Sequence, residues 1–275
     1  MLTLKDSQAL AERFRREGEY RSPPDTVRRW RGLARIRYYT RLMAIYMASA
    51  RIARRGEYTL EQYALASHRI LRLVESLGGV IEVKGFAHLA SAGPAVIISN
   101  HMSSLETGML PGLILPFRDV AFVIKTSLLT YPIFGQIMRS VKSVAVTRDN
   151  PREDLRQVLE QGTRLLEQGV NVAIFPQATR SVEFDPGGFN SLGVKLAARA
   201  GVPVIPLALK TNFQENGTRM KDFGRIDPRE VTRFYFGAPI AVEKTGRAAQ
   251  EQVVAHILSY LREWRIPIKP VEVKT

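Results

Sequence analysis

Hydrophobic and polar positions along most of this chain predict strands interleaved with helices. Short apolar runs bounded by turn residues predict strands at residues 80–83, 95–99, 120–124, 143–147, 171–175, 203–210 and 231–236. Apolar positions at helical spacing predict helices at residues 104–114, 128–139, 149–168, 191–200 and 247–264. This order predicts an α/β fold with a mostly parallel, helix-covered sheet, to which antiparallel edge strands can be added.

The N-terminal part has a different pattern. Residues 1–27 are polar and end in a Ser-Pro-Pro-Asp turn, which predicts a tail. Six arginines between residues 28 and 41 precede the apolar stretch LMAIYMASA, and three more follow it. A helix over residues 38–53 would be about 24 Å long, too short to cross a hydrocarbon core of about 30 Å but long enough to lie in its interface. A second helix follows Gly56 and ends at Gly78-Gly79.

This pattern divides the chain into two parts. We expect a polar tail and an amphipathic two-helix segment that contacts a membrane at residues 1–79, and an α/β domain at residues 80–275. The alternative for the helix pair is packing against the main domain with its arginines solvated.

Composition and charge restrict the class of protein. The chain is 45% hydrophobic and 24% charged, which is typical of a globular protein. It has no cysteine, which excludes disulfides, thiolate metal sites and a cysteine acyl-enzyme and fits a reducing compartment. The formal net charge of +14 favours an anionic partner, namely nucleic acid, an anionic membrane surface, or acidic small molecules and carriers. Without a signal peptide or an apolar run long enough to span a bilayer, we expect a cytosolic or peripheral protein.

The stretch AVIISNHMSSLE at residues 95–106 is the first candidate site. His101 follows a predicted buried strand, and the carboxyl ends of such strands are where open α/β sheets place their sites. Glu106 lies five residues later, so the two side chains could form a catalytic base and its orienting carboxylate. Ser103 and Glu106 also have the spacing of a capping box at a helix start. Both interpretations stay open on this stretch alone.

The stretch FPQATRS at residues 175–181 is the second candidate. It follows another predicted buried strand and offers a guanidinium from Arg180 and hydroxyls from Thr179 and Ser181, which suit a phosphate. The alternative is a turn in which Arg180 makes a surface ion pair. A phosphate-binding Walker loop, a G-x-S-x-G nucleophile and an H-E-x-x-H metal pair are all missing from the sequence, and we expect no metal site.

In this order the motifs resemble the glycerolipid acyltransferase family, whose best-known members are 1-acyl-glycerol-3-phosphate acyltransferases. Asn100-His101-x4-Glu106 is similar to the family's N-H-x4-D, FPQATR to its F-P-E-G-T-R, and VPVIP at residues 202–206 to its V-P-V-x-P strand. Arg148 in SVAVTRDN matches the arginine of its second block, and Lys125 matches its lysine before a Pro-x-Phe-Gly turn. The resemblance covers residues 80–240, with glutamate in the first motif and Gln-Ala in the third.

The resemblance also implies residue roles. His101 would act as the general base on the acceptor hydroxyl, which attacks an acyl thioester directly, and Glu106 would hold the correct tautomer. The residues implied to bind substrate, mostly around the acceptor's phosphate, are Lys125, Arg148, Gln177, Thr179, Arg180 and Ser181. The candidates for the wall of an apolar acyl tunnel, each of which could equally be an ordinary core residue, are Leu128, Leu129, Ile133 and Phe134.

The activity that the resemblance implies is that of a membrane-associated O-acyltransferase of phospholipid biosynthesis. It would transfer a fatty acyl group from acyl-ACP or acyl-CoA, as co-substrate and without a cofactor, to the hydroxyl of a lysolipid. With 1-acyl-glycerol-3-phosphate as acceptor the product is phosphatidic acid. The implied partners are an anionic membrane surface, acyl carrier protein or a coenzyme A thioester, and the lysolipid. The implied location is peripheral, on the cytoplasmic face of the cell membrane.

The departures from the family motifs leave alternatives open. Gln177 loses the charge of the family's glutamate, and Ala178 loses the freedom that glycine gives to positive φ. Another acceptor, such as a lysophospholipid or a lyso-ornithine lipid, therefore stays open, as does a catalytically silent relative that binds lipid. Nucleic-acid binding is suggested by charge alone, and the sequence contains no recognised module for it, so we expect no nucleic-acid partner.

Overall fold

One sheet lies at the centre of the computed structural model, which describes residues 2–23, 33–243 and 245–270. Its eight strands within those residues are β1 (Tyr20–Arg21), β2 (Ile81–Lys84), β3 (Val96–Ser99), β4 (Val120–Lys125), β5 (Ser143–Val146), β6 (Asn171–Ile174), β7 (Val204–Lys210) and β8 (Thr232–Phe236). Their order is β1-β2-β8-β7-β3-β6-β4-β5. The strands from β7 to β5 run parallel, and β8 runs antiparallel to β7. The predicted α/β fold with a mostly parallel sheet is confirmed.

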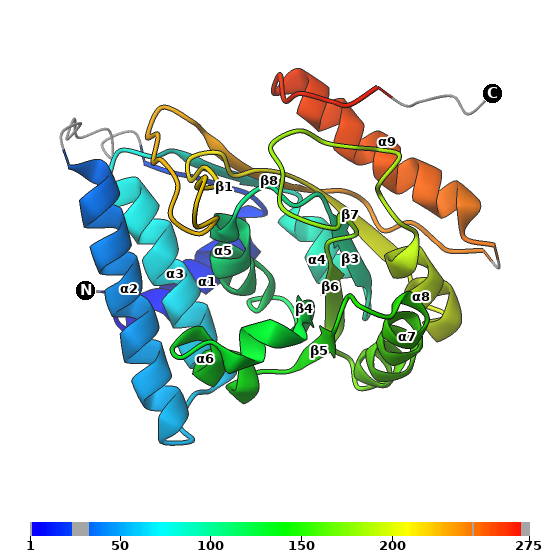
Figure 1. The fold of residues 1–275 in the computed structure, drawn as a ribbon, viewed down its shortest axis with the longest axis horizontal. Helices are drawn as coiled ribbons and strands as arrows, with labels where there is room; N and C mark the ends of the chain where they lie inside the picture. The colour runs from blue at the N-terminus through cyan, green and yellow to red at the C-terminus, as the bar shows by residue number, and fades with distance from the viewer. Residues whose placement is uncertain (1, 24–32, 244, 271–275) are drawn as a thin grey trace.

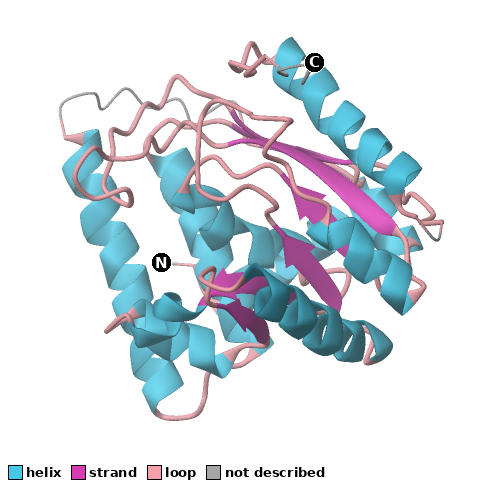
Figure 2. Cartoon of the chain, turned by 45° about the vertical axis from the view of Figure 1, so that its right-hand side comes forward, coloured by secondary structure: helices cyan, strands magenta, loops and turns pink. Residues whose placement is uncertain are grey.

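Helices cover both faces of this sheet (Figures 1 and 2). They are α1 (Leu4–Glu17), α2 (Ala34–Arg54), α3 (Leu60–Ser76), α4 (Phe86–Ser91), α5 (Ser104–Ile114), α6 (Phe134–Ser140), α7 (Pro151–Glu167), α8 (Leu192–Ala200) and α9 (Arg247–Glu263). One layer contains α7, α8 and α9, and the opposite layer contains α1, α3, α4 and α5. Because both faces are covered, every residue of β3, β6 and β7 is buried, which explains their continuous apolar runs.

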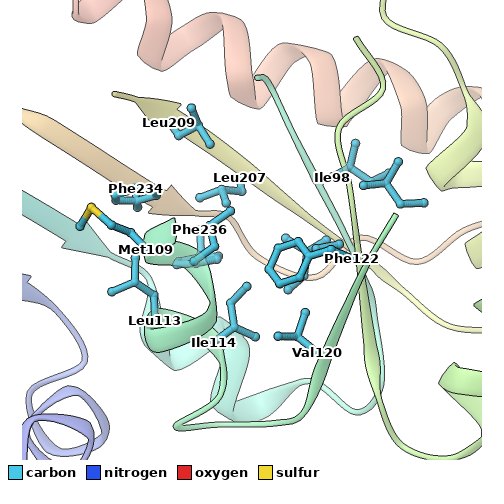
Figure 3. Close-up of a cluster of buried hydrophobic side chains, with 14 of the residues drawn as sticks. Ile98, Met109, Leu113, Ile114, Val120, Phe122, Leu207, Leu209, Phe234 and Phe236 are labelled. Carbon is cyan, nitrogen blue, oxygen red and sulfur yellow. The ribbon is translucent and has the colours of Figure 1, made fainter. Parts of the chain in front are cut away.

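Helix α5 is fixed against the sheet by its apolar side chains. Figure 3 shows Met109, Leu113 and Ile114 of α5 gathered with Leu207 of β7 and Phe236 of β8, and all five are buried. Each such side chain contributes roughly 1.5–3 kcal/mol when it is buried. The packing holds the first turn of α5 beside the carboxyl end of β3, and the candidate site lies there.

Helix α3 crosses α5 so closely that residue 112 has to be glycine. A Cβ atom at Gly112 would lie 2.7 Å from Cδ2 of His68 and 2.9 Å from Cβ of Ser67. Ser67 Oγ donates to the carbonyl of Met109 at 2.7 Å and accepts from Gly112 N at 2.8 Å. His68 Nε2 donates to the carbonyl of Gly112 at 2.8 Å. The helix that precedes the α/β domain in sequence is therefore bonded directly to the helix that carries Glu106.

The prediction of a polar tail at residues 1–27 is wrong for its described part. Thr3 and Asp6 form a capping box at the start of α1, and Gly18 ends the helix with φ 70°. Leu10 and Phe14 of α1 are buried in the core, and Tyr20 then pairs with Val83 in β1 and β2. The segment looked like a tail because only a few apolar residues, on one narrow side of the helix, hold it to the molecule.

The single helix predicted over residues 128–139 is also wrong. A 3₁₀ helix spans Thr126–Thr130, Tyr131 then takes an extended conformation with ψ 136°, and α6 begins at Phe134. Pro132 explains the break, since the residue before proline is driven away from helical backbone.

The predicted N-terminal helix pair is present as α2 and α3, which pack against each other. Of the arginines expected before α2, Arg28, Arg29 and Arg31 lie outside the described residues. Large apolar side chains on or beside α2 are exposed, with 61% of Leu33, 61% of Ile36 and 47% of Met47 accessible. Among residues 2–23, 33–243 and 245–270, no helix is both long and apolar enough to cross a membrane.

Candidate active site

His101 and Glu106 form a hydrogen-bonded pair where β3 meets α5. Nδ1 of His101 lies 2.8 Å from Oε1 of Glu106, and the glutamate is fully buried while 14% of the histidine side chain is exposed. An ionised carboxylate only accepts hydrogen bonds, so Nδ1 carries the proton and donates it to Glu106. This tautomer leaves Nε2 of His101 with a free lone pair. The pair has the geometry of a general base and its orienting carboxylate.

Glu106 also caps α5, so the structure contains the hydrogen bond of one interpretation and the capping box of the other. Its Oε1 accepts from the backbone N–H of Met102 at 2.7 Å and of Ser103 at 2.8 Å. Its Oε2 accepts from Oγ of Ser103 at 3.0 Å and from Oγ1 of Thr211 at 2.5 Å. Burial by itself would raise the pKa of Glu106, but the hydrogen bonds from His101 and Thr211 and the electrostatic interaction with His101 outweigh it and lower that pKa. The carboxylate is therefore ionised at neutral pH.

The FPQATRS segment holds His101 from the other side. The ring of Phe175 stacks on the imidazole, with centroids 4.4 Å apart and planes inclined by 22°. The side-chain oxygen of Gln177 accepts from the backbone N–H of His101 at 2.6 Å, and Ser181 N donates to the carbonyl of His101 at 2.9 Å. Both polar groups of the His101 backbone are thus bonded to this segment, and the two motifs form one unit.

A pocket of about 560 Å³ opens beside His101. Four of the six predicted substrate-binding residues line it together with His101, namely Lys125, Arg148, Thr179 and Arg180. The other two, Gln177 and Ser181, are bonded to the backbone of His101 as described above, and in the described part of the chain they do not belong to the pocket lining.

The remaining wall of the pocket is apolar. Three of the predicted tunnel residues line it, namely Leu128, Ile133 and Phe134, whereas Leu129 packs against the core instead. Helix α2 contributes Leu42 and the half-buried ring of Tyr46, which the sequence reasoning did not assign to the site. A pocket lined by cations, apolar side chains and His101 suits an amphiphile that carries an anionic head group.

Arg148 has an unusual backbone for an arginine. Its φ is 67°, in the left-handed region that residues other than glycine rarely adopt. Asp154, in the first turn of α7, holds this conformation by accepting from the backbone N–H of Arg148 at 2.7 Å and of Thr147 at 2.8 Å. The guanidinium then reaches the carbonyl of Ala178 at 2.6 Å. Strained backbone of this kind concentrates at functional sites. Here it directs the side chain of Arg148 to the FPQATRS segment.

The other cations in the pocket lining, and Lys221 beside it, differ in their partners. Nη1 of Arg180 lies 2.6 Å from Oδ1 of Asp222, and Nζ of Lys221 donates to Oγ1 of Thr179 at 2.8 Å. Lys125 makes no side-chain hydrogen bond or ion pair within the residues that the structure describes. Arg180 thus makes the ion pair that its surface alternative predicted, but it makes it inside the pocket.

Sequence reasoning missed Thr211, Lys221 and Asp222. Thr211 had a usable signal, because it directly follows β7, the neighbour of β3, and parallel strands bring their carboxyl ends together. Lys221 and Asp222 had none, since they lie in an irregular loop with no motif.

Comparison with known proteins gives the family. The family model described as Acyltransferase matches residues 80–210, the part of the chain that carries the site. A protein of Pseudomonas aeruginosa named 1-acyl-sn-glycerol-3-phosphate acyltransferase is 38% identical over 127 residues, which cover 46% of this chain and 48% of that protein. One of Escherichia coli K12 with the same name is 24% identical over 205 residues, which cover 73% of this chain and 78% of the relative. The match thus spans about half the length of the Pseudomonas relative.

A solved structure has the same fold. The crystal structure of the 1-acyl-sn-glycerophosphate (LPA) acyltransferase PlsC from Thermotoga maritima superimposes with a TM-score of 0.63 at 17% identity, over 85% of this chain and 95% of that chain. The central domain is thus an acyltransferase domain by sequence and by fold. The matched residues, 80–210, belong to the glycerolipid acyltransferase family, as their motifs predicted.

Proposed function

We propose that this protein transfers a fatty acyl group from a thioester to the free hydroxyl of a lysolipid. The acceptor we propose is 1-acyl-glycerol-3-phosphate, and the product is then phosphatidic acid. The observation that carries the proposal is the His101–Glu106 pair, 2.8 Å apart, whose histidine lines a pocket together with cations and apolar side chains. The names of the Pseudomonas and Escherichia relatives support the choice of acceptor.

The chemistry needs one base and no covalent enzyme intermediate. Nε2 of His101 takes the proton of the acceptor hydroxyl while that oxygen attacks the thioester carbonyl carbon. The tetrahedral intermediate then collapses, the carbon–sulfur bond breaks, and the leaving thiolate receives the proton from Nε2. The buried negative charge of Glu106 stabilises the imidazolium between these steps.

The acceptor's phosphate would lie among Lys125, Arg148 and Arg180, because a phosphomonoester carries up to two negative charges and arginine binds it bidentately. The departure at Gln177 does not argue for another acceptor. Its oxygen accepts from the His101 backbone, which a glutamate oxygen could do equally well, and it is only 8% exposed. Ala178 is likewise no obstacle: among the described residues other than glycine, only Arg148 and Arg265 have positive φ.

The donor we propose is acyl-ACP or acyl-CoA. Both are acidic, and the formal net charge of +14 supports their attraction to this protein. We further propose that the protein acts peripherally on the cytoplasmic face of the cell membrane, with α2 in the interface. The exposed side chains of Leu33, Ile36 and Met47 support this placement, since they would be buried among lipids there.

The test is thioester turnover with defined acceptors. Purified protein with lysolipid in mixed micelles should release thiol from acyl-CoA or acyl-ACP, and the His101→Ala variant should not. His88→Ala is the matched control, because that histidine makes no side-chain hydrogen bond within the described residues and lies on α4, outside the pocket lining. A panel of lysophosphatidic acid, other lysophospholipids and lyso-ornithine lipid separates the acceptors. Full activity in His101→Ala would refute the mechanism, and binding without turnover by the wild type would indicate a silent relative.

A further inference from the structure

The loop between β7 and β8, residues 211–231, lies against the start of α5, directly after His101 (Figure 1). Gln214 donates through Nε2 to Oγ of Ser104 at 2.9 Å, and Asn216 donates through Nδ2 to the carbonyl of Met102 at 2.8 Å. These bonds attach the loop to residues directly after His101. The loop is therefore held in place by residues that lie next to His101 in the sequence.

The same loop is attached to α2 on its other side. The hydroxyl of Tyr38 donates to Oε1 of Gln214 at 2.9 Å, and that of Tyr39 donates to the carbonyl of Gly224 at 3.1 Å. The ring of Tyr39 also packs on Phe223, with centroids 5.1 Å apart. Held between α2 and α5, the loop presents two consecutive charged residues to the FPQATRS segment.

Those two residues are Lys221 and Asp222. Lys221 bonds to Thr179 at 2.8 Å, and Asp222 bonds to Arg180 at 2.6 Å. Asp222 is the single acidic residue in the pocket lining among the described residues. Its side chain is 51% exposed, whereas that of Arg180 is 18% exposed, so the carboxylate can move into solvent more easily than the guanidinium can.

We propose that Lys221 is an acceptor-binding residue and that Asp222 occupies the phosphate's place on Arg180 until the acceptor binds. The inference rests on the proposed function and adds a specificity element to it. A phosphomonoester would replace the carboxylate on the guanidinium, because it carries more charge and can accept two parallel hydrogen bonds where Asp222 accepts one. Lys221 would then exchange the neutral hydroxyl of Thr179 for a phosphate oxygen, which is the stronger, charge-assisted bond.

Selectivity follows from this exchange. A lysolipid whose phosphate is a diester carries one charge and offers fewer free oxygens, so it competes less well with Asp222 for Arg180. The wild-type protein should therefore favour a phosphomonoester acceptor over a phosphodiester one.

Steady-state kinetics of three variants test the proposal, with lysophosphatidic acid as the varied acceptor. Lys221→Met should raise KM about tenfold, the scale of one hydrogen bond to a charged group, and leave kcat near the wild-type value. Asp222→Asn should lower KM, because the competing charge is gone while its backbone carbonyl still accepts from Gln214. Arg219→Met is the matched control, since it removes an exposed cation from the same loop that, unlike Lys221, bonds to no pocket-lining residue within the described part of the chain, and it should change neither constant.

A soluble competitor gives a second measurement. Glycerol 3-phosphate should inhibit Asp222→Asn more strongly than the wild type, and Lys221→Met more weakly. A higher KM in Asp222→Asn would mean that the carboxylate only positions Arg180, and would overturn the proposal. Equal constants for Lys221→Met and Arg219→Met would remove Lys221 from the site. A wild type that acylates no lysophosphatidic acid would refute the proposed function instead, and this inference with it.

Discussion

The proposed mechanism gives Glu106 a catalytic task in addition to the capping of α5 that the structure shows. In Glu106→Gln, the amide oxygen can keep the bonds to His101 and Met102, while its NH2 group faces the hydroxyls of Ser103 and Thr211, which can rotate to accept. The variant keeps the tautomer but loses the charge that stabilises the imidazolium. We expect acyl transfer to fall by at least about 100-fold and the free energy of unfolding to fall by about 1 kcal/mol.

Ser103→Ala is the control for that prediction. It removes the capping hydroxyl and leaves the bond from His101 to Glu106 in place, so stability should fall by a similar amount with activity close to the wild type. Turnover assays and chemical denaturation of both variants compare the two tasks. An equal loss of activity in both would reduce Glu106 to a cap.

At the residue scale, only part of the candidate site could be predicted from the sequence. The spacing of His101 and Glu106 and the residues of FPQATRS predicted the base, its carboxylate and two polar groups of the pocket. Thr211 and Asp222 could not be predicted in the same way, because their contacts join residues more than 40 positions apart and depend on how the loop after β7 packs.

Among the elements, α1 depends on a few contacts for its place in the fold. Phe14 is fully buried, and its ring stacks on Phe86 with centroids 4.9 Å apart. Phe14→Ala should lower the free energy of unfolding by about 3–5 kcal/mol, because it removes a large core side chain and leaves a cavity. Leu4→Ala on the same helix should change it by no more than about 0.5 kcal/mol, since 36% of Leu4 is exposed. Urea denaturation distinguishes an integral helix from the tail that the sequence suggested.

The junction of α1, α3 and α5 should respond to pH through His68. Burial lowers the pKa of His68 to about 4, and its Nδ1 accepts from Oγ of Ser7 at 2.7 Å. The ordinary pKa is 6.5, so as the pH falls below that value the unfolded chain binds the proton and the folded protein does not. The contribution of His68 to the free energy of unfolding is fully present above pH 6.5 and is lost as the pH falls towards 4. We expect a loss of about 2 kcal/mol at pH 5 relative to pH 7.

Urea denaturation across this pH range measures the effect, with His68→Gln as the control. Because glutamine does not titrate, the free energy of unfolding of the His68→Gln variant should decline less steeply over the same range. Parallel pH dependences in the two proteins would assign the decline to other groups.

The elements themselves were predicted to different degrees. Helix α5 has the predicted bounds, because a capping box marks its start and its apolar residues recur at helical spacing. The order of the strands, the reversed direction of β8 and the membership of β1 were not predictable, since strand pairing joins distant segments and leaves no local pattern.

For the whole molecule, the exposed apolar residues of α2 and the net charge predict binding to anionic vesicles. Ile36→Glu should weaken this binding about tenfold or more, because it replaces a large apolar contact by a charge that the lipids repel. Ala255→Glu adds the same charge at an exposed position of α9, in the helix layer on the other side of the sheet, and should bind like the wild type. Vesicle sedimentation at low and high salt gives both affinities. Equal weakening in the two variants would mean that charge alone, and not α2, determines the contact.

The bond between Gln177 and the backbone of His101 has a consequence for redesign. Although position 177 lies inside the motif associated with head-group recognition, its side chain holds the backbone of His101 in place. An engineer who wants a new acceptor should keep an oxygen acceptor there and diversify Thr179 and the loop at residues 218–222. A library that also randomises position 177 would lose active members for a reason unrelated to the lipid being selected.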